Sequence, residues 1–290
     1  MCAWRDGVEA GWHGWFDAAE VVYPKGTIWG RMDLSVIVPA YREGPRIHKN
    51  LLRLLAELDQ LGVSYEVIVV SDGNTDNTSS EVERLGSPQV KVLSYAINKG
   101  KGYALGYGVG RSIGRLVTFI DADMELDPRD IRSFIDLMQE HEADIVIGSK
   151  RHPLSKVAYP AFRRLESVVY QLLIRVIFNL NVRDTQTGHK LFRREVLADV
   201  LPLLAVKRFA FDLELLVVAH HLGYRRVVEA PITLDYQFNS TVRPGAVFSI
   251  LWDTAAIFYR LRVLRYYDRR RQELLQLAGG KPDAIKGDQI

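Results

Sequence analysis

The sequence lacks the features that would place it in an oxidising compartment or across a membrane. Its 290 residues contain one cysteine, Cys2, so no internal disulfide is possible. No run of 18 apolar residues is free of charge, because Arg175 interrupts one candidate and Asp253, Arg260 and Arg262 interrupt another. The first residues lack a basic stretch followed by an apolar core, so no signal peptide is expected. Together these absences predict a cytoplasmic protein.

An excess of charge of either sign is also absent. Lys and Arg number 38 and Asp and Glu number 35, which gives a formal net charge of +3. A balance this close argues against nucleic-acid binding through bulk charge. With 48% hydrophobic and 25% charged residues, the chain has the composition of a globular protein with one large domain or two small ones.

Short apolar runs alternate with helical patterns over the first half of the chain. This alternation is typical of an α/β fold with a mostly parallel sheet flanked by helices. Apolar residues recur at helical spacing from Ile47 to Leu61. The pair Asp127-Pro128 is expected to cap and open a helix that extends to about Glu140. The expected strands are Ser35–Pro39, Tyr65–Ser71, Val90–Tyr95, Leu116–Ile120 and Asp144–Ser149.

The alternation is lost after His152, where longer helices with short strands are expected. The two halves therefore differ in pattern, although neither is expected to be an independent domain. The expected segments are an N-terminal extension over residues 1–31, an α/β half over 32–150, a more helical half over 151–245, an amphipathic helix over 246–277 and a disordered tail over 278–290.

Polar residues follow the predicted strands where an open α/β sheet binds its ligands, beyond the carboxyl ends of the strands. The glycines of Asn98–Gly102 permit close approach of the backbone to a ligand, and Lys101 could face a diphosphate. In extended backbone, the spacing of Asp121 and Asp123 points both carboxylates the same way, as a divalent cation such as Mg²⁺ or Mn²⁺ requires. Glu125 continues this face. Helix capping is the commoner explanation of an isolated Asp-x-Asp, but the neighbouring polar loops favour a metal site here.

Three of these segments resemble the family 2 inverting glycosyltransferases, which have the GT-A (Rossmann-like) fold. They are Val36–Glu43, Ser71–Thr78 and Asp121–Asp123, and the resemblance covers roughly residues 34 to 267. Arg42 and Asn74 depart from the family pattern, at turn positions. The resemblance implies a metal-dependent enzyme with a nucleotide-sugar donor. It implies nucleoside binding by Pro39, Tyr41, Glu43 and Asp72, and contact with the sugar diphosphate and its metal by Asp121 and Asp123.

The second half carries a more specific resemblance. The motif Asp184–Phe192, followed by Arg208–Leu215, is similar to dolichyl-phosphate glucosyltransferases and, less closely, to the corresponding mannosyltransferases. It implies transfer of a hexose from UDP-glucose or GDP-mannose to a polyprenyl or dolichyl phosphate, and it favours UDP-glucose. Asp184 and Gln186 would lie beside the transferred sugar, and Asp123, Asp184 and Arg151 are the expected catalytic residues. The acceptor phosphate would be bound by Arg151, Arg163, Thr187, Gly188 and Arg243.

The segment 246–277 is apolar, rich in aromatic residues and followed by clustered arginines. This pattern is typical of a helix that lies on anionic lipid, and it fits equally well an ordinary core helix with a solvated basic end. We expect peripheral attachment at the cytoplasmic face of a membrane.

Two other functions remain open at this stage. A transferase that acts on a sugar or small-molecule hydroxyl would need a general base, for which Asp184 and Glu214 are the first candidates. A subunit that binds a nucleotide-sugar without catalysis is the other, and the presence of both Asp121 and Asp123 argues against it.

Overall fold

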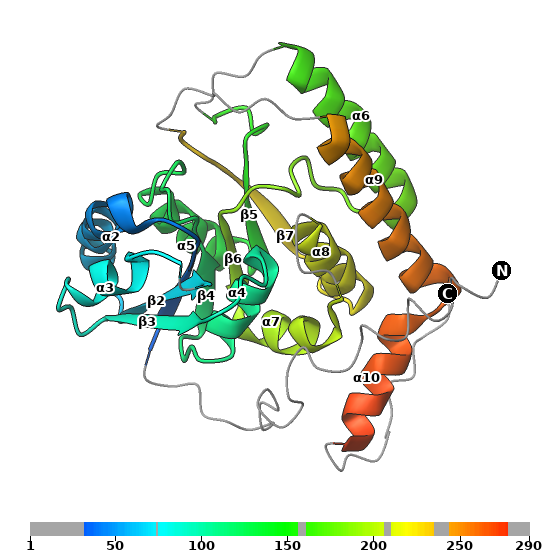
Figure 1. Ribbon diagram of the computed structural model, residues 1–290. Helices are drawn as coiled ribbons and strands as arrows, with labels where there is room; N and C mark the ends of the chain where they lie inside the picture. Colours follow the sequence, from blue (N-terminus) through cyan, green and yellow to red (C-terminus); the bar gives the residue numbers. More distant parts are fainter. Residues whose placement is uncertain (1–31, 74, 156–160, 206–209, 235–243, 278–290) are drawn as a thin grey trace.

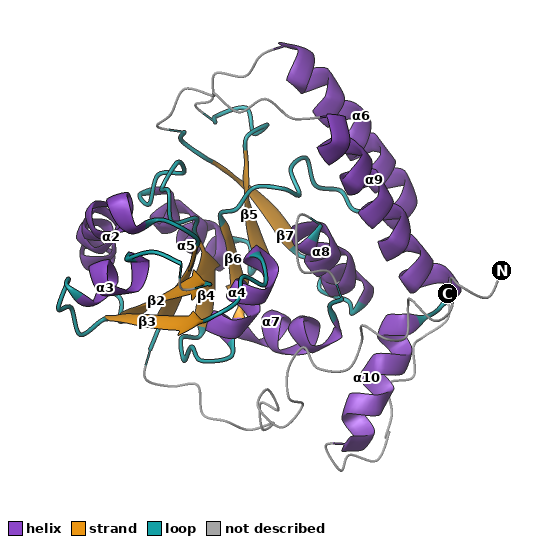
Figure 2. Ribbon diagram, in the orientation of Figure 1, coloured by secondary structure: helices purple, strands orange, loops and turns teal. Residues whose placement is uncertain are grey.

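The computed structural model describes residues 32–73, 75–155, 161–205, 210–234 and 244–277, with the backbone alone for 161–169 and 244–249. Within these ranges a central sheet carries helices on both faces (Figure 1), and strands and helices alternate along much of the chain (Figure 2). The predicted α/β class is confirmed. The expected N-terminal extension and the expected C-terminal tail lie outside the described residues.

In the described residues, seven strands form one sheet in the order β3-β2-β1-β4-β6-β5-β7. Strand β6 runs antiparallel to both of its neighbours, β4 and β5. All remaining pairs of adjacent strands are parallel. The five predicted strands are all present, with ends within one residue of the prediction. The strands are β1 (Leu34–Ala40), β2 (Tyr65–Asp72), β3 (Val90–Tyr95), β4 (Leu116–Phe119), β5 (Ile145–Ser149), β6 (Lys190–Arg193) and β7 (Val227–Pro231).

Both faces of the sheet are buried because successive side chains of a strand point to opposite faces. In β1, Ile37 belongs to the core on one face, while Val36 and Val38 belong to the core on the other. Helices α4, α7 and α8 contribute to the first core, and α2, α3 and α5 to the second. The helices of the sheet layers are α2 (Gly44–Leu58), α3 (Thr78–Glu83), α4 (Lys101–Val109), α5 (Asp130–Glu140), α7 (Arg194–Val200) and α8 (Phe211–His221).

Helix α5 begins later than the sequence predicts. The expected cap, Asp127, is 1% exposed, and its carboxylate accepts a hydrogen bond of 3.0 Å from the Arg129 backbone N–H. It also pairs with the guanidinium groups of Arg129 and Arg53. These contacts hold residues 127–129 in a turn, and Asp130 is the first helical residue. The predicted start at Pro128 is therefore two residues early.

The C-terminal segment contains two helices where one was predicted over 246–277. Helix α9 (Pro244–Phe258) continues into a π-helical turn, Tyr259–Val263, and α10 (Tyr266–Leu277) follows. Arg265, between them, has a φ of +46°, which a right-handed helix cannot accommodate.

Helix α9 lies beside α6 (Ala161–Phe178), and the two hydroxyl oxygens of Tyr170 and Thr254 are hydrogen-bonded at 3.0 Å (Figure 1). In the part of the chain that the structure describes, no helix has both the length and the apolar character needed to cross a bilayer.

Candidate active site

The loops that follow β1 and β2 are bonded to each other. The Gly44 N–H donates to the Asp76 carboxylate (3.1 Å), and the Glu43 N–H donates to the Thr78 hydroxyl (3.0 Å). A Cβ atom at Gly44 would lie 2.0 Å from Asn77 Oδ1, so the two loops approach as closely as glycine permits. The first predicted nucleoside-binding segment is therefore fixed against the second.

The predicted nucleoside-binding residues of the first loop differ in their accessibility. Pro39 lies at the end of β1 and is partly buried. Tyr41 is 43% exposed, and the Arg42 guanidinium lies 5.2 Å from its ring centroid. The Glu43 carboxylate is paired with Arg46. Tyr41 thus presents an aromatic surface to solvent, whereas Glu43 already has a cationic partner.

Asp72 shapes the loop at the start of α4. Its side chain is buried, and its two carboxylate oxygens accept hydrogen bonds from the backbone N–H groups of Lys99 (2.7 Å) and Gly100 (2.9 Å). Gly100 has a φ of +95°, a conformation that favours glycine. In this structure Asp72 therefore positions the loop that presents Lys101.

Lys101 and Asp121 form an ion pair, with Nζ 2.5 Å from Oδ1 and side chains 37% and 36% exposed. Gly188, from the second half of the chain, lies against the same pair. A Cβ atom at Gly188 would be 2.1 Å from Asp121 Oδ2 and 3.0 Å from Lys101 Nζ. The contact brings a predicted acceptor-binding residue against two predicted donor-binding residues.

The local charges shift two pKa values. Burial by itself lowers the pKa of Lys101, but the carboxylates of Asp121 and Asp212 more than compensate, so this pKa is raised. Burial, together with the negative charge of Asp121, raises the pKa of Asp123. Glu125 and Glu43 act on Asp123 in the same direction. The edge of the sheet is thus a cluster of carboxylates, one of which is paired with Lys101.

The donor set fits a divalent cation shared with a diphosphate, not one enclosed by protein. Within the described ranges, no three His, Cys, Asp or Glu side chains come together as a metal site. Glu125 is exposed, and its role as a third metal ligand stays a prediction. Mg²⁺ is commonly bound through one or two carboxylates and the phosphates of a substrate. Asp121 and Asp123 meet that requirement by themselves.

Asp184 organises the turn that was expected to bind sugar and phosphate. Its Oδ1 accepts the Gln186 N–H (3.1 Å), and its Oδ2 accepts the Thr187 hydroxyl (2.6 Å) and the Lys150 N–H (3.2 Å). Thr187 is 1% exposed, whereas the Gln186 side chain is exposed. The hydrogen bond between Thr187 and Asp184 therefore stabilises the turn, and Gln186 is the residue of the turn that faces solvent.

Lys190 and Asp212 form a buried ion pair beneath this turn. Both lie in the motif segments 184–192 and 208–215, but neither was predicted as a site residue. The Lys190 side chain is 0% exposed, and its ammonium lies 2.5 Å from Asp212 Oδ1. It also donates to the Thr187 carbonyl oxygen. The available signal was a lysine immediately before the apolar residues Leu191 and Phe192 of a strand. Asp212 also raises the pKa of Lys101. The charged groups of Asp121, Lys101, Asp212 and Lys190 therefore alternate in sign.

Of the three predicted acceptor-binding arginines, only Arg151 has a side chain among the described residues. Arg151 is partly buried, and its guanidinium donates to the side-chain oxygen of Gln171, in α6, and to the Arg183 carbonyl oxygen (3.4 Å). Arg163 lies in α6, but its side chain is outside the described residues, as is all of Arg243. Their roles in acceptor binding remain predictions.

Glu214 is not placed to act as a general base. It is fully buried, and its carboxylate accepts hydrogen bonds from the Ala205 N–H (2.9 Å) and the Tyr267 hydroxyl (2.6 Å) and pairs with Arg260 (3.3 Å). These contacts fasten the C-terminal helices to α8. Arg260, expected in the basic end of a lipid-binding helix, faces the protein core instead, with 12% of its side chain exposed.

His189 is a further buried polar group in the 184–192 segment that was not predicted as a site residue. It is 0% exposed and stacks on Phe134, with 4.3 Å between ring centroids. Among the described residues neither ring nitrogen has a hydrogen-bond partner. Burial lowers the pKa of His189 to about 4, so the ring is neutral at physiological pH.

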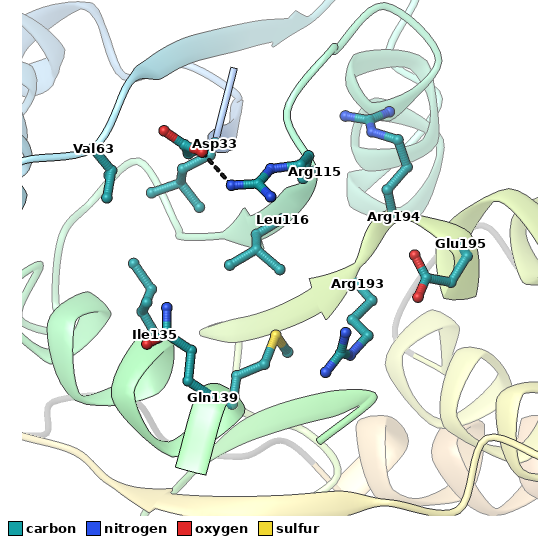
Figure 3. Close-up of a pocket in the computed structure, with 11 residues that line it drawn as sticks. Asp33, Val63, Arg115, Leu116, Ile135, Gln139, Arg193, Arg194 and Glu195 are labelled. Carbon is teal, nitrogen blue, oxygen red and sulfur yellow. Dashed lines mark hydrogen bonds and ion pairs between the residues drawn. The ribbon is translucent and has the colours of Figure 1, made fainter. Parts of the chain in front are cut away.

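A cavity of about 440 Å³ lies at the opposite end of the sheet, where β1 and β4 begin (Figure 3). Apolar side chains such as Leu34 and Leu116 line it together with Arg115 and Arg193. Arg115 is paired there with Asp33 (2.5 Å). None of the predicted site residues lines this cavity, so it is separate from the candidate active site.

A mostly parallel sheet with carboxylates directly after β4 is the arrangement expected of a glycosyltransferase of the GT-A type. The chain belongs to glycosyl transferase family 2, whose family model matches residues 35–201.

Curated relatives are named dolichyl-phosphate beta-glucosyltransferase. The Drosophila melanogaster protein is 37% identical over 209 residues, which cover 66% of this chain and 64% of that protein. The Dictyostelium discoideum protein is 33% identical over 205 residues, covering 66% and 63%. A Trichomonas vaginalis protein is 31% identical over 254 residues, covering 82% and 77%. The matched part of the chain thus spans a little under two thirds of the first two relatives.

Solved structures of low sequence identity share the fold. Glucosyl-3-phosphoglycerate synthase from Mycobacterium tuberculosis, in complex with UDP, superposes with a TM-score of 0.58 at 17% identity, covering 96% of this chain and 89% of that chain. Mannosyl-3-phosphoglycerate synthase from Rubrobacter xylanophilus gives a TM-score of 0.55 at 17% identity, covering 89% and 78%. The predicted GT-A fold is thereby confirmed.

Proposed function

We propose that this protein transfers glucose from UDP-glucose to a dolichyl or other polyprenyl phosphate, with inversion at the anomeric carbon. The observation that carries the proposal is the contact of Gly188 with Asp121 and Lys101. It brings the turn expected to bind the acceptor phosphate against the residues expected to bind the sugar diphosphate. The names of the curated relatives support the same donor sugar and acceptor.

Asp121 and Asp123 would hold Mg²⁺ or Mn²⁺ together with the donor diphosphate. A bound divalent ion supplies positive charge against the departing nucleoside diphosphate. Lys101 binds diphosphate oxygens, and Tyr41 offers its exposed ring to the base. The 184–188 turn, fixed by Asp184 and Thr187, sets the position of the acceptor phosphate.

The acceptor needs no general base. A phosphate monoester has a second pKa of about 6 and is largely dianionic at neutral pH, so it attacks without losing a proton. Both candidate bases are already engaged by other groups. Asp184 accepts hydrogen bonds from Gln186, Thr187 and Lys150. Glu214 is buried against Tyr267 and Arg260.

We propose further that α6 and α9 bring the enzyme to a lipid surface. On α6, Leu172 and Val176 are 61% and 76% exposed, and on α9 Trp252 is 58% exposed. Arg175 on α6 and Arg262, in the π-helical turn that follows α9, are also exposed. Exposed apolar and aromatic side chains interspersed with arginines suit the interface of an anionic membrane.

The reaction is tested with radiolabelled UDP-glucose and, separately, GDP-mannose, each incubated with a short polyprenyl phosphate and Mg²⁺ or Mn²⁺. Label extracted into the organic phase from UDP-glucose supports the proposal, and a β-linked product supports inversion. Label from GDP-mannose alone would correct the sugar. Label released only into water, or no release with either donor, would contradict the lipid acceptor.

Membrane binding is tested by sedimentation with vesicles of anionic phospholipid. Trp252→Glu and Val176→Glu are expected to weaken binding because each buries a charge in the lipid interface. Leu52→Glu is the matched control, since Leu52 is 52% exposed on α2, away from these helices. Equal weakening by all three substitutions would contradict a specific lipid-binding face.

A further inference from the structure

The Asp121 carboxylate already has a cationic partner within the protein. Lys101 Nζ lies 2.5 Å from Oδ1, and Gly188 packs so closely that an added Cβ would lie 2.1 Å from Oδ2. Both oxygens are thus approached by protein atoms. A divalent cation that binds Asp121 must compete with the Lys101 ammonium.

Lys101 has the freedom and the alternative partners to leave Asp121. It is the first residue of α4, and 37% of its side chain is exposed. The Asp212 carboxylate also acts electrostatically on Lys101 and raises its pKa. Movement of the ammonium towards an incoming anion therefore requires only side-chain rotation at the start of a helix.

Asp123 has no comparable cation at hydrogen-bond distance. Among the described residues, its carboxylate accepts the Glu125 backbone N–H at 3.2 Å and is not part of any ion pair within 4.0 Å. While Lys101 is paired with Asp121, its positive charge offsets one of the two carboxylate charges. A metal ion at this site then meets a net charge of about −1 instead of −2. Displacing Lys101 restores the full charge of the pair.

We propose that Lys101 is an exchangeable counter-ion, which holds Asp121 in the donor-free enzyme and moves to the donor's diphosphate when the nucleotide binds. Metal binding at Asp121 then depends on the nucleotide diphosphate. The exchange is balanced in charge, since the ammonium leaves a carboxylate for phosphate oxygens and the carboxylate accepts a metal cation. The inference rests on the proposed function of Asp121 and Asp123 as metal ligands. By linkage, metal ion and nucleotide strengthen each other's binding equally.

The test is titration of Mn²⁺ into the full chain, with free Mn²⁺ followed by electron paramagnetic resonance, in the absence and presence of UDP. Without nucleotide, Lys101→Met is expected to bind Mn²⁺ about fivefold more tightly than the wild type, the change expected for loss of a partly exposed ion pair. Addition of UDP is expected to tighten Mn²⁺ binding more in the wild type than in Lys101→Met.

Lys99→Met is the matched control. It removes the same charge from the same loop, but Lys99 Nζ bonds to the Tyr103 hydroxyl (3.1 Å) and lies over aromatic rings, away from Asp121. Its Mn²⁺ affinity without nucleotide should match that of the wild type. Lys101→Gln should shift affinity as Lys101→Met does, which covers the case in which the methionine variant does not fold.

Two negative results have different meanings. Equal Mn²⁺ affinities of wild type and both Lys101 variants without nucleotide, with an equal gain on adding UDP, would overturn the exchange and leave the metal site standing. No Mn²⁺ binding by any of these proteins, even with UDP, would overturn both the proposed metal site and this inference. The measurement involves neither sugar transfer nor lipid, so the identity of the acceptor does not affect it.

Discussion

The Tyr267 hydroxyl donates a hydrogen bond of 2.6 Å to the Glu214 carboxylate, and the two side chains are 1% and 0% exposed. The bond joins α10 to α8, and the two bonded residues lie 53 positions apart in the sequence. A buried carboxylate is stable only where donors and cations surround it. Tyr267, Arg260 and the Ala205 N–H supply them here.

Tyr267→Phe is expected to lower the free energy of unfolding by about 2 kcal/mol, because the Glu214 carboxylate loses a donor in a site that water cannot enter. Urea unfolding followed by circular dichroism measures the change. Tyr259→Phe is the control: Tyr259 is 43% exposed, and its substitution should change stability by less than about 0.5 kcal/mol. Equal effects would show that the Glu214 contact is not structurally important.

The buried pair of Lys190 and Asp212 is expected to be strongly coupled. Lys190→Met leaves the Asp212 carboxylate without its cation and the Thr187 carbonyl without its donor, so the free energy of unfolding should fall by about 3–5 kcal/mol. Asp212→Leu leaves the buried Lys190 ammonium without its carboxylate partner. The double variant should therefore be less destabilised than the sum of the two single variants, as measured by a double-mutant cycle in urea. Strict additivity would contradict a direct interaction between them.

The sheet and the placement of the first-half loops follow from local sequence patterns. The apolar runs predict β1 to β5 to within one residue, because burial on both faces of the sheet leaves a continuous apolar run such as Val67–Val70 in β2. Asp121 and Asp123 are located by the same argument, since the carboxyl ends of parallel strands share one edge.

Contacts between distant segments could not be predicted in this way. No local pattern shows that Gly188 packs against Asp121, or that Lys190 pairs with Asp212, because these contacts depend on how β6 inserts beside β4. The same applies to Arg260, which a sequence pattern places on a basic helix end and which the fold turns inward onto Glu214.

Gly188→Ala tests whether the close packing of Gly188 against Asp121 is needed for sugar transfer. The added methyl would lie 2.1 Å from Asp121 Oδ2, and because the Asp121 side chain is 36% exposed, the carboxylate can move aside at little cost in stability. We expect kcat/KM for transfer to fall about a hundredfold through misplacement of the carboxylate, with a small change in urea midpoint. Gly110→Ala, where the nearest atom would be 3.5 Å away, should keep full activity. Retained activity in Gly188→Ala would contradict the proposed contact of the two halves.

His189 predicts a pH dependence of stability. Its pKa in the folded protein is about 4, below the value of about 6.5 in an unfolded chain, so between these values the unfolded state binds a proton that the folded state does not. The contribution to stability is therefore present above pH 6.5 and is lost as pH falls towards 4, by about 3 kcal/mol in total. Asp121, Asp127 and Lys190 are the charged groups that act on this ring.

His189→Phe should remove that contribution, because phenylalanine keeps the stacking on Phe134 and has no proton to bind. Unfolding by urea at pH 7, 6, 5 and 4 gives a slope for each protein, and the variant should have the shallower one. The comparison of slopes is independent of any effect of ring size at neutral pH. Parallel slopes would mean that His189 is not the group that titrates.

The metal site is tested by comparing the carboxylates of one loop. Asp123→Ala should lower kcat/KM for transfer at least about a hundredfold, since a metal ion contributes several kcal/mol to stabilising the leaving diphosphate. Burial and neighbouring carboxylates raise the pKa of Asp123, so the folded protein disfavours its ionised form. Removing this carboxylate should therefore leave the free energy of unfolding unchanged or increase it. Glu125→Ala, at an exposed position outside the two-carboxylate pair, should keep activity within about tenfold of the wild type. Equal loss in both variants would support Glu125 as a third metal ligand, and activity near wild type in Asp123→Ala would remove Asp123 from the site.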